Sequence, residues 1–161
     1  METHSKLNKV RRIDLKMVDI SDKPEVFREA IAEGIIKLKP ETMRLINEGK
    51  IAKGNPLQTA TIAGVLAAKQ TSTLIPLCHP LPLTNVEVDI RILGRSALQV
   101  TATVKTTAQT GVEMEALTAV TIGLLTLWDM VKQYEKDAKG QYPFTRIENI
   151  RVMKKVKGSP K

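Results

Sequence analysis

The sequence predicts a single α+β domain in which helices pack on one face of a mainly antiparallel sheet. Two segments of alternating apolar residues, 83–94 and 98–104, flank Gly94-Arg95-Ser96 and predict a β-hairpin. Residues 116–128 contain no charged side chain, which is typical of a helix buried in a core or between subunits. The predicted order is strand, helices, hairpin, helix and strand.

The N-terminal part of the domain is predicted to contain a strand and a helix. Residues 15–20, Leu-Lys-Met-Val-Asp-Ile, are predicted to form a short strand. The segment 24–38 begins with a proline and is predicted to form a helix. Its apolar residues recur at helical spacing, at Val26, Phe27, Ala30, Ile31 and Ile35.

Residues that typically begin or end helices mark the next elements. Pro40 suits the first turn of a helix that Gly49 ends. Asn55 is a favourable N-cap for the helix after it. The predicted elements are helices over residues 40–48, 56–70 and 112–136, the hairpin, and a C-terminal strand from residue 142 onward.

The length of 161 residues suits one folded domain. Residues 1–14 are polar and basic, and we expect a mobile arm, either a solvated tail or an arm that closes over a ligand. Residues 15–157 would form the single domain, and residues 158–161 a tail.

The formal net charge of +8 predicts an anionic partner: nucleic acid, acidic lipid or a phosphorylated substrate. With one Trp, two Tyr and two Phe the chain offers few rings for stacking bases, which disfavours single-stranded nucleic acid. No apolar run reaches the roughly 18 residues of a membrane span. The first residues lack the apolar core of a signal peptide, and one cysteine forms no internal disulfide. We therefore expect a cytoplasmic protein.

Charged residues mark both ends of the long predicted helix. Thr110 and Glu113 match the capping-box pattern, so Glu113 is either a cap or a site residue. Asp129 and Lys132 share a face, as an ordinary ion pair or as part of a site. Glu115 and Asp129 point in similar directions but lie about 21 Å apart along the axis. We hypothesise that two such helices pack antiparallel across a two-fold axis, which brings Glu115 of one subunit to Asp129 of the other.

Lys53 and Gly54 precede a predicted helix N-terminus, where free N–H groups and a lysine favour a phosphate group. The glycine spacing is not that of a Walker A loop, and many helices begin in this way.

Cys78 and His79 lie in a run with three prolines, residues 74–82, which should be held extended. Zinc is disfavoured because the chain has one cysteine, two histidines and no Cys-x-x-Cys pair. Adjacent residues in an extended segment point to opposite sides. We expect Cys78 to face the core, which leaves His79 as a ligand contact, a proton carrier or a plain hydrogen-bonded side chain.

Two runs, Ile-Pro-Leu-Cys-His-Pro-Leu over residues 75–81 and Thr-Gly-Val-Glu-Met-Glu-Ala-Leu-Thr-Ala over residues 110–119, carry a specific resemblance. They resemble the cyclic pyranopterin monophosphate synthases of molybdenum-cofactor biosynthesis. The similarity extends over most of residues 15–135 and includes residues 17–21, Lys53-Gly54, residues 60–69 and Asp129-Met130 with Lys132.

The resemblance implies a ferredoxin-like α+β subunit and a homohexamer, a trimer of dimers with active sites at subunit interfaces. It implies a lyase with no bound cofactor and no metal-ligating residues, which binds neither nucleic acid nor membrane; the sequence does not determine whether the reaction requires a metal ion. The substrate would be 3′,8-cyclo-7,8-dihydroguanosine 5′-triphosphate, supplied by a radical S-adenosylmethionine GTP cyclase. The products would be cyclic pyranopterin monophosphate and pyrophosphate.

The resemblance also assigns roles. Asp129 would be the catalytic acid/base, while Lys53 and Lys132 would bind phosphate or assist proton transfer. Lys155 is the best match for a lysine in the family's C-terminal signature. The residues implied to bind substrate are Leu77, Cys78, His79, Met114, Glu115, Glu113, Thr110, Arg28 and Lys155.

The chain departs from the family pattern at Asn55, where many members have aspartate, and at Gln109, which replaces a frequent lysine. Two other functions are compatible with the sequence. One is a small basic RNA-binding protein, which would show steep salt dependence and little preference for a nucleoside triphosphate. The other is a scaffold that binds the pterin intermediate without turning it over.

Overall fold

Eight elements follow one another in the computed structural model, which describes residues 14–158. They are β1 (Val26–Lys37), α1 (Pro40–Asn47), α2 (Pro56–Lys69), α3 (Thr71–Leu74), β2 (Leu83–Leu93), β3 (Ala97–Ala108), α4 (Glu113–Glu135) and β4 (Arg146–Lys157). The hairpin, the three longer helices and the C-terminal strand are confirmed, whereas the four-residue helix α3 was not predicted.

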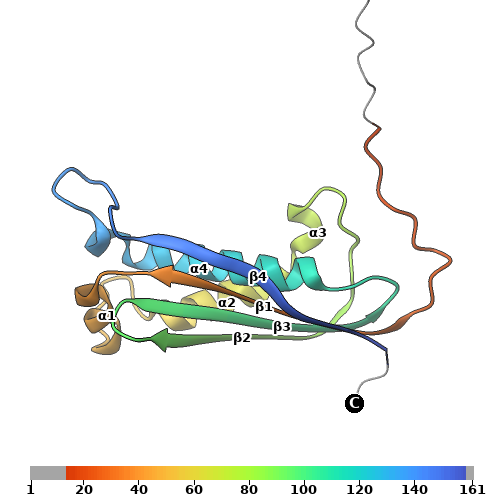
Figure 1. Cartoon of the computed structure of the whole chain (residues 1–161), viewed down its shortest axis with the longest axis horizontal. Helices are drawn as coiled ribbons and strands as arrows, with labels where there is room; N and C mark the ends of the chain where they lie inside the picture. Colours follow the sequence, from red (N-terminus) through yellow and green to blue (C-terminus); the bar gives the residue numbers. More distant parts are fainter. Residues whose placement is uncertain (1–13, 159–161) are drawn as a thin grey trace, which may run out of the picture.

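The four strands form one sheet in the order β2-β3-β1-β4, and all three pairings are antiparallel. Helices α2 and α4 run behind this sheet, and α1 packs at one end of it (Figure 1). Reading β1, helices, β2, β3, α4, β4 along the chain gives the ferredoxin-like βαββαβ arrangement. The predicted α+β class with helices on one face is confirmed.

The predicted helix over residues 24–38 is wrong, because this segment forms the central strand β1. Its buried positions follow a period of two, at Ala30, Ala32, Gly34 and Ile36. Most of the buried residues on this face are small and give a weak hydrophobic signal. The spacing of the larger apolar side chains therefore suggested the period of a helix. Pairing with β3 on one side and β4 on the other then decides the conformation.

The predicted strand over residues 15–20 is also wrong. Residues 14–20 contain no helix or strand, and Lys23 N donates to the Ile20 carbonyl oxygen in a turn. The sheet ends at β2 and β4, and this segment pairs with neither edge. It lies against the proline-rich run instead. The predicted mobile arm, residues 1–14, falls almost entirely outside the described residues.

Helix α4 is the centre of the core. Its buried face, which includes Ala119, Val120, Leu124 and Leu127, packs on β1 and β3. α4 is also long and apolar enough to cross a membrane by length and composition alone, and 50% of that stretch is buried inside the subunit. Burial on the sheet and on α2 accounts for the apolar character of the buried part of this helix.

The helix starts confirm one predicted cap and contradict another. Asn55 Oδ1 accepts hydrogen bonds from the N–H groups of Leu57 and Gln58, as an N-cap does. The capping box at Thr110 and Glu113 is absent, because α4 begins after Val112 without a side-chain cap. The Glu113 carboxylate turns to Lys155 instead.

Candidate functional site

Three predicted catalytic residues meet near the C-terminal end of α4. Lys53 Nζ lies 2.7 Å from Asp129 Oδ2, and Lys132 Nζ lies 2.8 Å from Asp129 Oδ1. Lys53 Nζ also donates to the Asp129 carbonyl oxygen at 2.8 Å. The cluster is exposed, so an anionic ligand can reach both ammonium groups from solvent.

The two lysines set the charge of the cluster. Hydrogen bonds from Lys132 and Lys53 lower the pKa of Asp129 to about 2. The same contact with Asp129 raises the pKa of Lys132. Asp129 is therefore ionised at neutral pH, where its carboxylate accepts hydrogen bonds that the two ammonium groups donate.

The loop before α2 brings Lys53 to α4. Tyr134 Oη accepts a hydrogen bond from Ala52 N at 2.9 Å, one residue before Lys53. Asp129 and Tyr134, both on α4, thus hold two consecutive residues of this loop. Asn55 takes the first free N–H groups of α2, and the Lys53 ammonium faces Asp129.

Residues at the opposite end of α4 surround a cavity of about 500 Å³, the α4 N-terminal cavity. The N-terminal segment, residues 14–23, and the proline-rich run line two sides of it, and the residues at the start of α4 line the third. Predicted site residues that line it are Leu77, Cys78, His79, Thr110, Glu113 and Met114.

Cys78 and His79 contact different partners, but the predicted extended conformation of residues 74–82 is wrong over its first half: α3 ends at Leu74, and Cys78 N donates to the Ile75 carbonyl oxygen in a turn. Cys78 Sγ lies 3.9 Å from Glu115 Oε1, and burial raises the pKa of this thiol. His79 Nε2 lies 2.8 Å from the Val18 carbonyl oxygen. Because a carbonyl only accepts, Nε2 is the donor, and His79 fastens the N-terminal segment beside the cavity.

Glu115 is a buried carboxyl group beneath this cavity, with 3% of its surface exposed. Burial raises its pKa, and the nearby Glu113 carboxylate adds to the effect. Its Oε2 has no hydrogen-bond partner among residues 14–158. Glu115 is not among the residues that line the cavity, and its contact with Cys78 connects it to the cavity wall.

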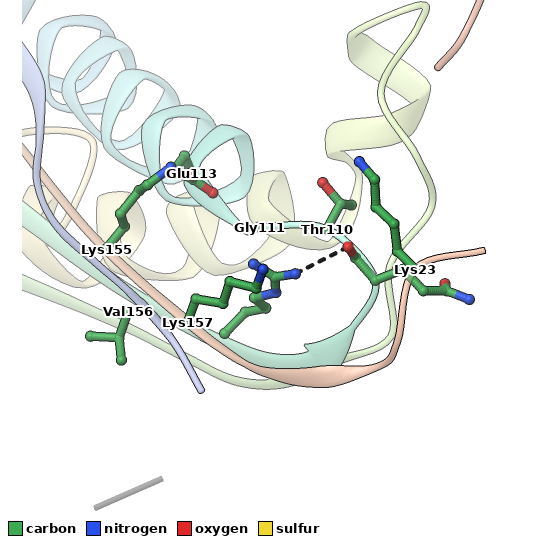
Figure 2. Close-up of a pocket in the computed structure, with 9 residues that line it drawn as sticks. Lys23, Thr110, Gly111, Glu113, Lys155, Val156 and Lys157 are labelled. Atoms are coloured by element: carbon green, nitrogen blue, oxygen red, sulfur yellow. Dashed lines mark hydrogen bonds and ion pairs between the residues drawn. The ribbon is translucent and has the colours of Figure 1, made fainter. Parts of the chain in front are cut away.

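A second cavity of about 390 Å³, the basic cavity, adjoins the first (Figure 2). The two share Lys23, Thr110, Gly111 and Glu113. Arg28, Lys155 and Lys157 add positive charge, which suits an anionic group. Although burial opposes it, the hydrogen bond from Lys155 helps hold the pKa of Glu113 below its usual value.

The predicted site residues thus fall into two groups at opposite ends of α4. The 14 positions that separate Glu115 from Asp129 correspond to roughly 21 Å along the helix axis. A small molecule does not span that distance, so one subunit does not bring the two groups together.

Several residues of the cavities and of the Lys53 loop were not predicted from the sequence. Lys23 and Lys157 line the basic cavity, but single lysines carry little signal in a chain with 25 lysines and arginines. Gln109 was noticed only as a departure from a family pattern, yet its carbonyl oxygen accepts from Arg28 Nη2 at 3.1 Å. Tyr134 gave no sequence signal because its partner is a backbone N–H group.

Within residues 14–158, no three His, Cys, Asp or Glu side chains are grouped as metal ligands would be. Fold and surface define a class: a basic α+β protein with acid–base side chains beside cavities suited to a phosphorylated small molecule.

Sequence comparison then identifies the family. A sequence profile of the MoaC family matches residues 17–158, and the chain belongs to this family. A relative from Pyrococcus horikoshii, named "Probable cyclic pyranopterin monophosphate synthase", is 60% identical over 143 residues, 89% of each chain. Proteins of the same name from Pyrococcus furiosus and Saccharolobus solfataricus are each 56% identical; they cover 94% and 89% of this chain, and 97% and 96% of their own lengths.

Proposed function

We propose that this protein is a cyclic pyranopterin monophosphate synthase, a phosphorus–oxygen lyase of molybdenum-cofactor biosynthesis. It converts 3′,8-cyclo-7,8-dihydroguanosine 5′-triphosphate to cyclic pyranopterin monophosphate and pyrophosphate. Membership of the MoaC family and relatives of 56–60% identity with that name support this activity. The observation that carries the mechanism is the cluster of Asp129 between Lys53 and Lys132.

The residues suit the chemical steps. Opening the purine five-membered ring and closing the pterin ring require proton transfers, and Asp129 and the two lysines are the acid–base groups that we propose for them. In the cyclisation, a sugar oxygen attacks the α-phosphorus and the bond to the pyrophosphate oxygen breaks. Lysine ammonium groups stabilise the negative charge that moves onto the leaving pyrophosphate.

The active site is assembled between subunits of a hexamer built as a trimer of dimers. Two observations support this part of the proposal. The site residues lie in two groups that one subunit keeps apart, and apolar side chains stay exposed on α2 and α4. Ile62 is 61% exposed, Leu66 52% and Leu125 49%. Exposed apolar side chains of this kind are typical of association sites.

The proposal includes the protein's place in the cell. A radical S-adenosylmethionine GTP cyclase supplies the substrate, and both enzymes act in the cytoplasm.

A turnover assay tests the function. The purified protein is incubated with the cyclised nucleotide, and pyrophosphate and pterin product are followed together. We expect product from wild type and a loss of at least roughly 100-fold in Asp129→Asn. Asp89→Asn is the matched control, because Asp89 is an exposed carboxylate 2.6 Å from Arg91 on β2. Substrate binding without turnover by wild type would identify a binding scaffold, and steeply salt-dependent RNA binding would favour the RNA-binding function.

A further inference from the structure

Strand β4 pairs irregularly with β1 at two places. Opposite Gly34 it places two residues, Asn149 and Ile150, between the partners of Glu33 and Ile35. Asn149 has φ 59°, a left-handed conformation that asparagine tolerates better than most residues. Farther along, Met153 is an extra residue between the partners of Ala32 and Ile31. Both irregularities are β-bulges.

The bulges decide which side chains of β4 face the helices. Successive side chains of a strand alternate between faces, so each extra residue reverses the alternation beyond it. On the outer face, Arg151 pairs with Glu33 at 2.8 Å. Counting regularly from Arg151 would turn Lys154 toward the helices and Lys155 outward.

The Met153 bulge produces the opposite result. Lys155 lies opposite Ala30, which is fully buried on the helix side, and Lys154 lies opposite Ile31. Accordingly, Lys154 Nζ is 3.6 Å from Glu29 Oε1 on the outer face. Lys155 Nζ is 3.0 Å from Glu113 Oε1 at the start of α4.

Lys155 thereby becomes part of the basic cavity. Figure 2 shows Lys155 reaching toward Glu113 and Lys157 entering the same space, while Val156 points to the other side of the strand. Lys154, its neighbour in sequence, does not line this cavity. Two adjacent lysines of identical chemistry thus serve opposite faces of one strand.

We propose that the Met153 bulge selects Lys155, and not Lys154, as the cation that β4 presents to a phosphate group in the basic cavity. The proposal rests on the proposed function only for the nature of the ligand, a phosphate of the nucleotide or the pyrophosphate product. The selection itself follows from strand register.

The two lysines provide a matched pair of variants. Binding of inorganic pyrophosphate to the purified full-length protein is measured by calorimetry for Lys155→Ala and Lys154→Ala. We expect affinity to fall roughly tenfold or more in Lys155→Ala, because a charged hydrogen bond is lost. Lys154→Ala should change affinity less than about twofold, since it removes only a surface ion pair.

A second measurement reports on register without a ligand. The Glu113 side-chain carboxyl is titrated by ¹³C NMR, with its signal assigned by its loss in Glu113→Gln. The pKa of Glu113 should rise in Lys155→Ala, which removes the hydrogen bond that lowers it. Lys154→Ala should leave it unchanged.

Deleting Met153 tests the bulge itself. The deletion removes the extra residue and leaves Lys155 opposite Ala30, so dependence on Lys155 should persist. If the wild-type strand had no bulge at Met153, pyrophosphate binding would depend on Lys154 in wild type and on Lys155 only after the deletion. That result would overturn the proposal. If the deletion variant does not fold, the two lysine variants decide alone.

The remaining outcomes are also decisive. Equal effects of both lysine variants contradict selection by the bulge. A response of Glu113 without any change in pyrophosphate affinity contradicts the phosphate role of Lys155. The wild-type protein could also bind pyrophosphate through Lys155 and yet not turn over the cyclised nucleotide. That result would contradict the proposed function and support the inference about Lys155.

Discussion

Two carboxyl groups of α4 have opposite electrostatic surroundings. Asp129 is exposed between two ammonium groups, and its pKa falls to about 2. Glu115 is buried, and its pKa is raised. Environments that push two carboxyl pKa values apart separate an ionised base from a neutral proton donor. The two ends of α4 therefore differ in electrostatic character: a charged, exposed carboxylate lies at one end and a buried carboxyl group with a raised pKa at the other.

The lysine partners should be measurable in the titration of Asp129. A depressed carboxyl pKa stabilises the fold above its unfolded value of 3.8, and this contribution is lost as pH falls toward about 2. In Lys132→Ala the Asp129 pKa should rise toward 3.8 in a ¹³C NMR titration, because the larger of the two lowering contacts is gone. Lys50→Ala, which removes an exposed lysine paired with Glu48, is the control. An unchanged Asp129 pKa in Lys132→Ala would contradict the geometry of the cluster.

Glu115 should make stability depend on pH in the other direction. Its raised pKa means that the protonated form favours folding. This contribution is complete below 4.5 and is lost as pH rises through the folded value. Glu115→Gln should therefore melt roughly 2–5 °C above wild type at pH 8 and match it at pH 4. Glu87→Gln, at an exposed position of β2, should show no such trend. Equal melting differences at both pH values would count against burial of the charge.

At the scale of elements, close packing between β1 and α4 depends on Gly34. A Cβ added there would lie 2.7 Å from Leu124 Cδ1 and 2.9 Å from Val120 Cγ1. Gly34→Ala should lower the free energy of unfolding by about 1–3 kcal/mol, the usual cost of overpacking a core. Denaturant unfolding monitored by circular dichroism measures this loss.

Gly123 on α4 supplies the contrasting control. A Cβ there meets its nearest atom, Val100 Cγ1, at 3.4 Å, an ordinary contact. Gly123→Ala should raise the free energy of unfolding by up to about 1 kcal/mol, since alanine is the better helix former. Effects of the same sign in the two variants would argue against the close packing of β1 on α4.

The loop that carries Lys53 depends on one hydroxyl group of α4. Tyr134→Phe removes the acceptor for Ala52 N–H and should cost about 0.5–1.5 kcal/mol. Hydrogen exchange at Ala52 should accelerate, because its amide loses its partner. Tyr142→Phe is the control, since the Tyr142 ring packs on Trp128 and the substitution keeps the ring. Unchanged exchange at Ala52 in Tyr134→Phe would contradict this anchoring role.

Elements with local signals were predictable, and elements defined by distant partners were not. Asn55 and Gly94 mark a helix start and a turn through their own conformational preferences. β1 becomes a strand because it pairs with β3 and β4, which lie far away in the sequence. The bulges in β4 also could not be predicted from local sequence. Lys155 was therefore predicted only through a family resemblance, with no physical reason to prefer it to Lys154.

At the scale of the whole molecule, the sequence predicted that the site residues lie in two separate groups, but it did not predict all the residues in each group. Helical spacing alone separates Glu115 from Asp129 by roughly 21 Å, and the two clusters lie at opposite ends of α4 as expected. The cations around the basic cavity converge from the N-terminal segment, β1 and β4. Only the folded sheet brings these segments together, so Lys23 and Lys157 could not be predicted from spacing.

A site shared between subunits predicts complementation between inactive variants. Glu115→Gln and Asp129→Asn damage opposite ends of α4, so a mixed dimer contains one site with both defects and one with neither. Exchanging subunits at a 1:1 ratio should restore roughly a quarter of wild-type turnover, because about half of the dimers are mixed and each has one intact site. The turnover assay on the mixture, with each variant alone as baseline, measures this recovery.

The matched control mixes Asp129→Asn with Lys132→Ala. Both substitutions damage the same end of α4, where Lys132 Nζ contacts Asp129 Oδ1, so each site in their mixed dimer keeps one defect. This mixture should recover nothing. Recovery in both mixtures would point to a change other than site assembly. Recovery in neither, with mass spectrometry showing that subunits have exchanged, would mean that the two ends of α4 do not meet across an interface.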